Sequence, residues 1–587
     1  MKPEKELLTG NEAIARGAWE AGVKVAAAYP GTPSTEILEN ISTYDEIYSQ
    51  WSVNEKVSLE VASGASIEGV RVLVAMKHVG LNVAADPFMT LAYTGVGGGL
   101  VLVFADDPYM HSSQNEQDNR YYAKMARVPL LEPSDSQEAK QYVKKAFEIS
   151  EQYDCPVLVK STTRISHSRS LVTLEERVEA NKREYVKDCQ KYVMIPAYGR
   201  QRHQVLLENW ERLKRFVAKS GLNYLYSPEK NQASEIGIVT SGISYQYARE
   251  VFDEYHILKL GITNPLPEED IAAFAKGKKL LLVVEELEPF LEQQIKALGL
   301  GVEVAGKKYL PPYGEFSLGV LKEAKRKLSN GSNLREQEKV IPAVPPRPPV
   351  LCAGCSHRTV FYVLRKLKLR VMGDIGCYTL SVLPPLNSMD TCLCMGAGVG
   401  QTLGMEKANP ELKGQLVSVI GDSTFFHSGI TSLIDNIYNQ GTNVVIILDN
   451  RITAMTGHQA HPGVGKTLKG EKVDIIWPEK IARALGVANV QAVDSYDLDG
   501  FEKTLRQELS NDGLSVIVAR QECVLLKKDR TQSTFYIDCA ACESCGVCLK
   551  FGCPAIQYRE EKYLIDKLLC TSCGVCVKLC KFGAIKT

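Results

Sequence analysis

The chain has 587 residues and a mass of 64.9 kDa, with 45% hydrophobic and 24% charged residues. This is a globular composition, and at roughly 100–200 residues per domain it suggests about three to five domains. Its 69 basic residues balance 69 acidic ones, so charge gives no reason to expect a nucleic acid or an anionic membrane as partner. The apolar runs 280–284 and 444–448 are far shorter than the roughly 20 residues that span a bilayer. The charged segment 1–12 lacks the apolar stretch of a signal peptide, so we expect a cytoplasmic protein.

The first 180 residues alternate between helical and strand-like patterns, which is typical of a parallel sheet covered by helices. The expected helices lie at 11–21, 34–41 and 55–68. The expected strands lie at 23–28, 50–53, 70–76 and 100–104.

Three further parts follow along the chain. Residues 181–234 are charged and helical in pattern, and we expect a helical linker there. A second α/β segment at 235–335 contains the expected strands 236–240 and 280–284. A proline-rich linker, 336–350, then leads to a third α/β segment at 351–530 and a cysteine-rich tail at 535–587.

The third segment predicts a ligand site at one sheet edge. The expected strand 416–421 leads into Gly421-Asp422-Ser423, a helix is expected at 425–438, and the strand 443–448 leads into Asp449-Asn450. The carboxyl ends of adjacent parallel strands share an edge, where α/β sheets bind ligands. Asp422 and Asn450 could then hold Mg²⁺ and, through it, a diphosphate, beside helix amino termini. Taken alone, a Gly-Asp pair and an asparagine more often form a turn and a strand end. Their place in a strand–helix–strand segment favours a site for a diphosphate cofactor. The pattern resembles the thiamine-diphosphate motif, with Ser423 in place of its last glycine.

The tail contains nine of the 17 cysteines in a repeat with an offset of 28 residues. A disulfide framework is disfavoured without a signal peptide, and cluster binding is favoured. Each half has a Cys-x2-Cys-x2-Cys triplet and a fourth cysteine, and two-cluster ferredoxins exchange the fourth ligand between halves. A zinc site is the alternative. The expected 4Fe–4S ligand sets are Cys542, Cys545, Cys548 and Cys580, and Cys570, Cys573, Cys576 and Cys553. The wider gap before Cys553 and Lys581 in place of the usual proline depart from the bacterial ferredoxin pattern.

Several long motifs add a family resemblance. They include Tyr29-Pro30-Gly31-Thr32-Pro33-Ser34, the segment 111–118, Cys352-Ala353-Gly354-Cys355-Ser356-His357-Arg358 and the segment 373–378. Over nearly its whole length the chain resembles the alpha subunits of the indolepyruvate:ferredoxin oxidoreductases, a thiamine-diphosphate-dependent family of 2-oxoacid:ferredoxin oxidoreductases.

The resemblance implies an α/β protein with several parallel-sheet domains and a carboxyl-terminal two-cluster ferredoxin domain. Residues 1–180 would be the pyrimidine-binding thiamine domain. Residues 235–335 would be a transketolase carboxyl-terminal-like domain. Residues 351–530 would bind the diphosphate and Mg²⁺ and carry a proximal cluster.

The resemblance also assigns roles to single residues. Glu55 matches the glutamate that assists the thiamine ring, with Glu60 as second choice and a solvated helix start as the alternative. Thr32 matches a threonine near the substrate carboxylate, or is a helix cap. His78, His111 and His458 lie in motifs that would line the pocket, with a hydrogen-bonded structural histidine as the alternative for each. His458 is the catalytic candidate among them. The other expected cofactor contacts are Gly376, Cys377, Gly421, Asp422, Ser423, Asn450, Ile452 and Gly457, with Asp422, Asn450 and Ile452 on Mg²⁺.

A third, proximal 4Fe–4S cluster is implied as well. Cys352, Cys355 and Cys377 match three of its ligands, and Cys523 is our choice for the fourth, in competition with Cys392 and Cys394.

The implied reaction is oxidative decarboxylation of an aryl 2-oxo acid, such as indolepyruvate, with coenzyme A. Electrons would pass through three clusters to ferredoxin. The partners would be a smaller beta chain of the gamma type, in a heterodimer or an α2β2 assembly. The alternatives are a thiamine-dependent oxidoreductase of another 2-oxo acid, a non-oxidative thiamine decarboxylase or ligase, and an electron-transfer module without catalysis.

Overall fold

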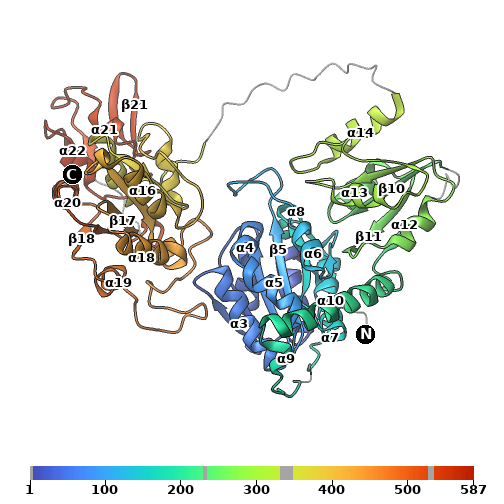
Figure 1. The fold of residues 1–587 in the computed structure, drawn as a ribbon. Coiled ribbons are helices and arrows are strands. Elements are labelled where there is room, and N and C mark those ends of the chain that lie inside the picture. Colours follow the sequence, from blue (N-terminus) through green and yellow to red (C-terminus); the bar gives the residue numbers. More distant parts are fainter. Residues whose placement is uncertain (1–3, 181, 229–233, 331–347, 527–534) are drawn as a thin grey trace. The chain divides into compact units, whose positions relative to one another are not determined.

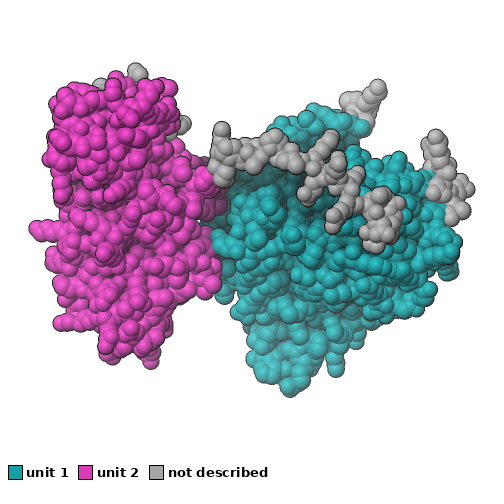
Figure 2. Space-filling view, turned by 90° about the horizontal axis from the view of Figure 1, so that it is seen from above, with its two compact units in different colours: residues 1–339 teal, residues 340–587 magenta. Residues whose placement is uncertain are grey.

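The computed structural model describes residues 4–180, 182–228, 234–330, 348–526 and 535–587 (Figure 1). The chain divides into two compact units, one up to residue 339 and the other from residue 340 (Figure 2). Most of the proline-rich linker predicted at 336–350 lies outside the described residues. Among the described helices, none has the length and apolar character needed to cross a membrane.

The first unit is built on a seven-stranded sheet of order β12-β6-β7-β5-β4-β2-β3, in which only the β12–β6 pairing is antiparallel. All residues of β4, β5 and β7 are buried, as expected for parallel strands covered on both faces by helices. The strands are β2 (Val25–Ala28), β3 (Tyr48–Trp51), β4 (Val72–Lys77), β5 (Leu100–Asp106), β6 (Leu130–Leu131), β7 (Val157–Thr162) and β12 (Ile262–Asn264). The helices around it are α1 (Gly10–Glu20), α2 (Thr35–Ile41), α3 (Glu55–Ile67), α4 (His78–Val83), α5 (Ala85–Thr94), α6 (Arg120–Ala126), α7 (Ser136–Tyr153) and α8 (Thr163–His167).

The predicted strand 50–53 is displaced. β3 ends at Trp51, because Asn54 is the N-cap of α3 and its side chain accepts the N–H of Val57 at 2.9 Å. The cap forces the residues between strand and helix into a connecting loop. A short antiparallel pair, β1 (Lys5–Thr9) with β8 (Arg169–Thr173), joins the two ends of this α/β segment.

The second α/β segment forms a five-stranded sheet of order β14-β13-β10-β11-β9, with β9 antiparallel. Strand β12 of this segment does not join that sheet. It pairs with β6 and extends the seven-stranded sheet instead. The segment predicted at 235–335 therefore contributes strands to both sheets. The helical pattern at 181–234 contains α9 (Cys189–Tyr192) and the 22-residue helix α10 (Pro196–Val217). The other elements are β9 (Tyr224–Tyr226), β10 (Ile236–Ser241), β11 (His256–Leu260), β13 (Leu280–Val284), β14 (Glu303–Ala305), α11 (Ser244–Val251), α12 (Glu268–Ala275), α13 (Phe290–Ala297) and α14 (Leu318–Asn330).

The second unit is built on a parallel sheet of order β15-β16-β17-β19-β18. The helix predicted at 425–438 is interrupted: 425–429 form one π-helical turn before α18 begins. The elements are α15 (His357–Lys366), β15 (Arg370–Met372), α16 (Ala397–Ala408), β16 (Leu416–Gly421), α17 (Asp422–Thr424), α18 (Ile430–Tyr438), β17 (Val444–Asp449), α19 (Pro478–Ala484), β18 (Asn489–Asp494), α20 (Leu498–Leu509) and β19 (Ser515–Arg520).

The cysteine-rich tail belongs to the same compact unit. Phe551, Val575 and Leu579 of the tail are part of the hydrophobic cluster that contains α15 and the central strands. The tail therefore packs on the third α/β segment. Its elements are β20 (Tyr536–Ile537), α21 (Val547–Lys550), β21 (Ile556–Arg559), β22 (Lys562–Ile565), α22 (Val575–Leu579) and β23 (Ile585–Lys586).

Candidate active site and cluster sites

The carboxyl ends of β16 and β17 bring a carboxylate and an amide to one edge of the sheet. β16 ends at Gly421, which pairs with Leu448 of β17. Asp422 and Asn450 follow these strand ends and are 3% and 7% exposed. The backbone N–H of Arg451 donates to Asp422 Oδ2 at 2.8 Å, so Asp422 links the two strand ends.

Asp422 remains ionised although it is buried. Burial raises its pKa, but His461 and the N–H groups of Ser423 and Arg451 outweigh this effect and hold the pKa below its ordinary value. His461 Nε2 lies 3.1 Å from Asp422 Oδ2. The N–H of Gly463 donates to His461 Nδ1 at 3.1 Å, which orients the imidazole with Nε2 toward the carboxylate.

The donor set at this edge fits a hard cation bound to a diphosphate. Asn450 Oδ1 accepts the N–H of Ile452 at 3.2 Å, and the N–H of Arg451 between them donates to Asp422, so the segment 450–452 lies beside Asp422. Carboxylate, amide and carbonyl oxygens are the ligands that Mg²⁺ prefers. His458 Nε2 is buried and lacks a hydrogen-bond partner in the described part of the chain, as expected of a group that faces a bound molecule. Among the described residues, no three His, Cys, Asp or Glu side chains converge on a single metal ion.

The side chain of Tyr378 packs against Gly376 and Gly421, two of the predicted cofactor contacts, and leaves no space for a Cβ atom at either position. Its hydroxyl accepts the N–H of Gly421 at 2.9 Å and donates to Ile375 O at 3.1 Å. A Cβ atom on Gly376 would lie 2.4 Å from the Tyr378 ring, and one on Gly421 would lie 2.9 Å from it. Gly457 has φ +120°, a backbone conformation that favours glycine.

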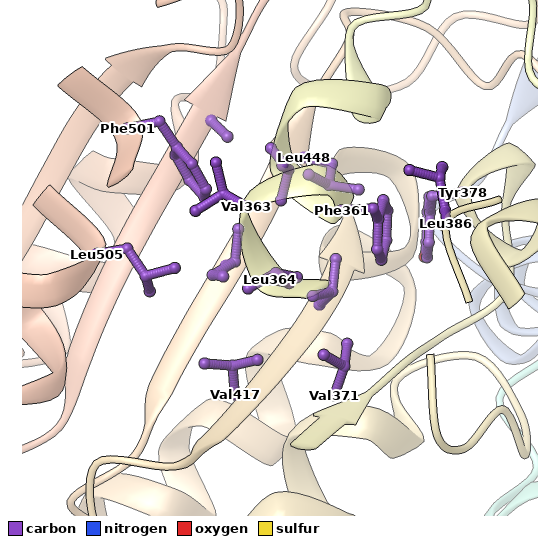
Figure 3. Packing of buried hydrophobic residues seen from close by; sticks show 14 of the residues in the cluster. Phe361, Val363, Leu364, Val371, Tyr378, Leu386, Val417, Leu448, Phe501 and Leu505 are labelled. Carbon is purple, nitrogen blue, oxygen red and sulfur yellow. The ribbon is translucent and has the colours of Figure 1, made fainter. Parts of the chain in front are cut away.

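Helix α15 connects this edge with the first cysteine motif. Its residues Phe361, Val363 and Leu364 pack into the core of the second unit, where Phe361 stacks on Tyr378 (Figure 3). His357, at the start of α15, is buried with Nε2 3.4 Å from Asn450 Nδ2. Burial lowers the pKa of His357 to about 4 although Asp422 raises it, so the ring is neutral at neutral pH.

Cys352, Cys355, Cys377 and Cys523, which we call the proximal cysteines, lie close enough to influence one another's pKa values. Burial and then the neighbouring thiols of this group raise the pKa of Cys355 to about 12 and that of Cys377 to about 11. Cys352 also raises the pKa of Cys523, after burial. Iron binding would deprotonate these thiols.

The competing cysteines lie beside a different group. Cys392 Sγ contacts Asp374 O at 3.6 Å. Burial and then Asp374 raise the pKa of both Cys392 and Cys394. This environment favours Cys523 as the fourth proximal ligand.

The tail contains two cavities, each lined by four cysteines and each enclosing about 360 Å³ of space that is partly open to solvent. The Cys542 cavity is lined by Cys542, Cys545, Cys548 and Cys580. The Cys570 cavity is lined by Cys553, Cys570, Cys573 and Cys576. These are the crossed sets that the repeat predicts, and four thiols around one space fit a cubane cluster.

In the first unit, Glu55 and Glu60 differ in environment. Glu55 is the first residue of α3 and is 5% exposed. Glu60 is half-exposed and pairs with Lys56 on the helix surface. A Cβ atom on Gly80 would lie 2.7 Å from Glu55 Cγ, so the glycine provides the space that the buried glutamate occupies. The burial favours Glu55 over Glu60 as the residue that meets a cofactor.

Sequence reasoning missed Lys77, which lies beside Thr32. Lys77 Nζ donates to Ser112 O at 2.5 Å, and Ser112 Oγ donates to Thr32 O at 3.2 Å. Burial lowers the pKa of Lys77 to about 8, while Asp107 opposes the shift. A lysine at the carboxyl end of the otherwise apolar strand β4 was the available signal. The N-cap of α2 is Ser34, so the helix-cap alternative for Thr32 is wrong.

The two histidines predicted to line the pocket in this unit, His78 and His111, differ in burial. His78 is fully buried, and its Nε2 lies 3.2 Å from Asn115 O. Burial and then Lys77 lower its pKa to about 4. His111 is exposed on a loop, with Nε2 3.6 Å from Glu315 Oε2.

Comparisons with protein families match three parts of the chain. Residues 16–209 match the family described as pyruvate flavodoxin/ferredoxin oxidoreductase, thiamine diphosphate binding. Residues 374–519 match the carboxyl-terminal TPP-binding domain of thiamine pyrophosphate enzymes. Residues 563–586 match the 4Fe–4S binding domain, which covers the second half of the tail repeat.

Curated relatives match nearly the whole chain. Indolepyruvate oxidoreductase subunit IorA of Archaeoglobus fulgidus is 41% identical over 99% of this chain and 97% of its own length. The subunit of the same name from Pyrococcus abyssi is 42% identical over 95% of this chain and 93% of its own length. A solved structure of 2-oxoglutarate:ferredoxin oxidoreductase from Magnetococcus marinus overlaps 55% of this chain and 65% of that one, with 15% identity and a TM-score of 0.47. Given the relatives that match it from end to end at this identity, the chain belongs to the family of the indolepyruvate oxidoreductase IorA subunits.

Proposed function

We propose that the chain is the thiamine-dependent, cluster-carrying subunit of an arylpyruvate:ferredoxin oxidoreductase. In this reaction a 2-oxo acid and coenzyme A yield an acyl-coenzyme A, CO₂, one proton and two electrons, and the electrons reduce ferredoxin. The observation that carries the proposal is that one compact unit holds the buried Asp422 at the sheet edge, two cavities lined by four cysteines each, and the four proximal cysteines. A reaction that only released an aldehyde would not need these electron carriers.

Asp422, Asn450 and the carbonyl of Ile452 would hold Mg²⁺, and Mg²⁺ would hold the diphosphate. The backbone around Gly376, Cys377, Gly421 and Ser423 would lie against the cofactor, with Gly457 and His458 closing the other side. Thiamine diphosphate, when bound, supplies a nucleophilic carbon and an electron sink for decarboxylation.

Residues of the first unit would bind and orient the reacting groups. Glu55 would contact the pyrimidine ring, since it is a carboxyl group that the fold buries. Lys77 and Thr32 would meet the substrate carboxylate, because a buried ammonium group attracts a carboxylate strongly when water is excluded.

The proximal cysteines would receive the electrons, and the Cys542 and Cys570 cavities would hold the clusters that pass them on. We propose three 4Fe–4S clusters per chain. Ferredoxin would be the acceptor, and a smaller beta chain would complete the enzyme as a heterodimer or an α2β2 assembly, in the cytoplasm.

The test is anaerobic co-purification with the beta chain, followed by assays with a viologen dye. Indolepyruvate, phenylpyruvate, pyruvate and 2-oxoglutarate are compared with and without coenzyme A. We expect dye reduction with the aryl substrates only, dependent on coenzyme A. Preference for pyruvate or 2-oxoglutarate would refute the aryl assignment, and aldehyde release without dye reduction would refute the oxidative reaction.

A further inference from the structure

Two cluster-binding loops of the second unit meet at Gly354. Gly354 lies between Cys352 and Cys355 in the chain and also lines the Cys570 cavity. A Cβ atom on Gly354 would lie 1.9 Å from Thr571 Oγ1, and Gly354 has φ +68°, so a larger residue here would be strained and would have to displace the Thr571 side chain. The Cys542 cavity, in contrast, is lined only by residues between 537 and 585. The loop that carries Cys352 and Cys355 therefore borders the Cys570 cavity through Gly354.

Arg358 joins the same two loops by hydrogen bonds. On one side its Nη2 donates to Leu351 O at 2.6 Å and to Cys352 O at 3.1 Å. On the other side its Nη1 donates to Gly552 O at 2.5 Å, next to Cys553. The planar guanidinium presents N–H donors in two directions, so it can satisfy both loops at once.

The Arg358 guanidinium is removed from water, which strengthens its interaction with neighbouring charges. Arg358 is 3% exposed. Burial lowers its pKa, while the thiols of Cys553 and Cys355 raise it. A buried cation interacts with a neighbouring charge far more strongly than an exposed one, because little solvent screens it.

We propose that Arg358 is a positioning residue for electron transfer between the proximal cluster and the cluster of the Cys570 cavity. It would hold the two loops at a fixed separation and stabilise the reduced form of both clusters, each of which gains one negative charge on reduction. In the transfer step the proximal cluster loses one electron and the Cys570 cluster gains it. The inference rests on the cluster assignment of the proposed function.

The test is an anaerobic redox titration of the full chain with its clusters, followed by electron paramagnetic resonance and iron analysis. Arg358→Met removes the charge, Arg358→Lys keeps it, and Arg365→Met is the matched control on the exposed end of the same helix. We expect Arg358→Met to keep its iron and to shift the reduction equilibria of two of the three clusters about tenfold toward the oxidised form, which is about 59 mV for a one-electron couple. The third cluster, the control and Arg358→Lys should stay near the wild type.

Unchanged equilibria in an iron-replete Arg358→Met protein would overturn the inference. If Arg358→Met loses iron, Arg358→Lys decides: full iron with near wild-type potentials supports it, and loss of iron in both variants means that Arg358 serves folding alone. A wild-type chain with only eight iron atoms would instead refute the cluster assignment, before any variant is measured.

Discussion

Gly80 leaves the space that Glu55 occupies: a Cβ atom on Gly80 would lie 2.7 Å from Glu55 Cγ and equally close to Oε1. The glycine lies in α4 and the glutamate begins α3, so two helices of the first unit approach at this carboxyl group. The close approach buries Glu55 without a large side chain on top of it. This arrangement fits the proposed contact of Glu55 with the pyrimidine ring.

Glu55→Gln should lower turnover by about 10²-fold or more, because the amide keeps the shape but cannot exchange the proton. Iron content and thiamine diphosphate binding should stay near the wild type. Hydrogen–deuterium exchange at thiamine C2, measured by NMR after acid quench, should slow in parallel. Glu60→Gln is the matched control on the same helix. The opposite pattern, with exchange abolished only in Glu60→Gln, would reverse our choice of carboxylate.

We expect Lys77 to cause a fall in kcat/KM at basic pH, the basic limb of the pH profile. Burial lowers its pKa to about 8, so the free enzyme loses this positive charge as the pH rises through 8. If the ammonium group binds the substrate carboxylate, kcat/KM should fall about tenfold per pH unit above that point. Lys77→Arg should move the limb to higher pH, and Lys77→Met should remove it and raise KM. A limb at the same pH in Lys77→Met would assign it to another group.

We expect the buried His78 to make the chain less stable in acid. Burial and then Lys77 lower its pKa in the folded chain to about 4, against an ordinary value of 6.5. Between these values the unfolded state binds more protons, so the free energy of unfolding decreases as the pH falls from about 6.5 to about 4, by up to ~3 kcal/mol. The Tm of His78→Gln should therefore depend less on pH in this window. His203→Gln, on the exposed side of α10, should keep the wild-type dependence.

We expect substitution of Cys523 to change the iron content of the chain. Three clusters correspond to about twelve iron atoms per chain. Cys523→Ala should lower the count toward eight or yield a proximal cluster with an altered paramagnetic signal, because one of four thiolates is lost. Cys392→Ala should match the wild type. If Cys392→Ala lowers the iron content and Cys523→Ala does not, the fourth proximal ligand is Cys392.

The repeat in the tail and the two strand ends at Asp422 and Asn450 could be recognised in the sequence, because spacing and periodicity are local properties of the chain. The Cys-x2-Cys-x2-Cys triplets set which thiols share a loop, and a parallel strand followed by a helix sets which residues lie at the sheet edge. The α/β class follows from the same periodicity.

Only the tertiary structure decided the contacts between distant segments. β12 joins the first sheet rather than its own, Lys77 meets Ser112, His461 faces Asp422, and Arg358 joins the Cys352 loop to Gly552. Each of these depends on packing between residues far apart in the chain, where burial and shape select the partner. The local pattern does not record that selection. For this reason the spacing of the proposed ligands could be recognised in the sequence, and the side chains that surround them could not.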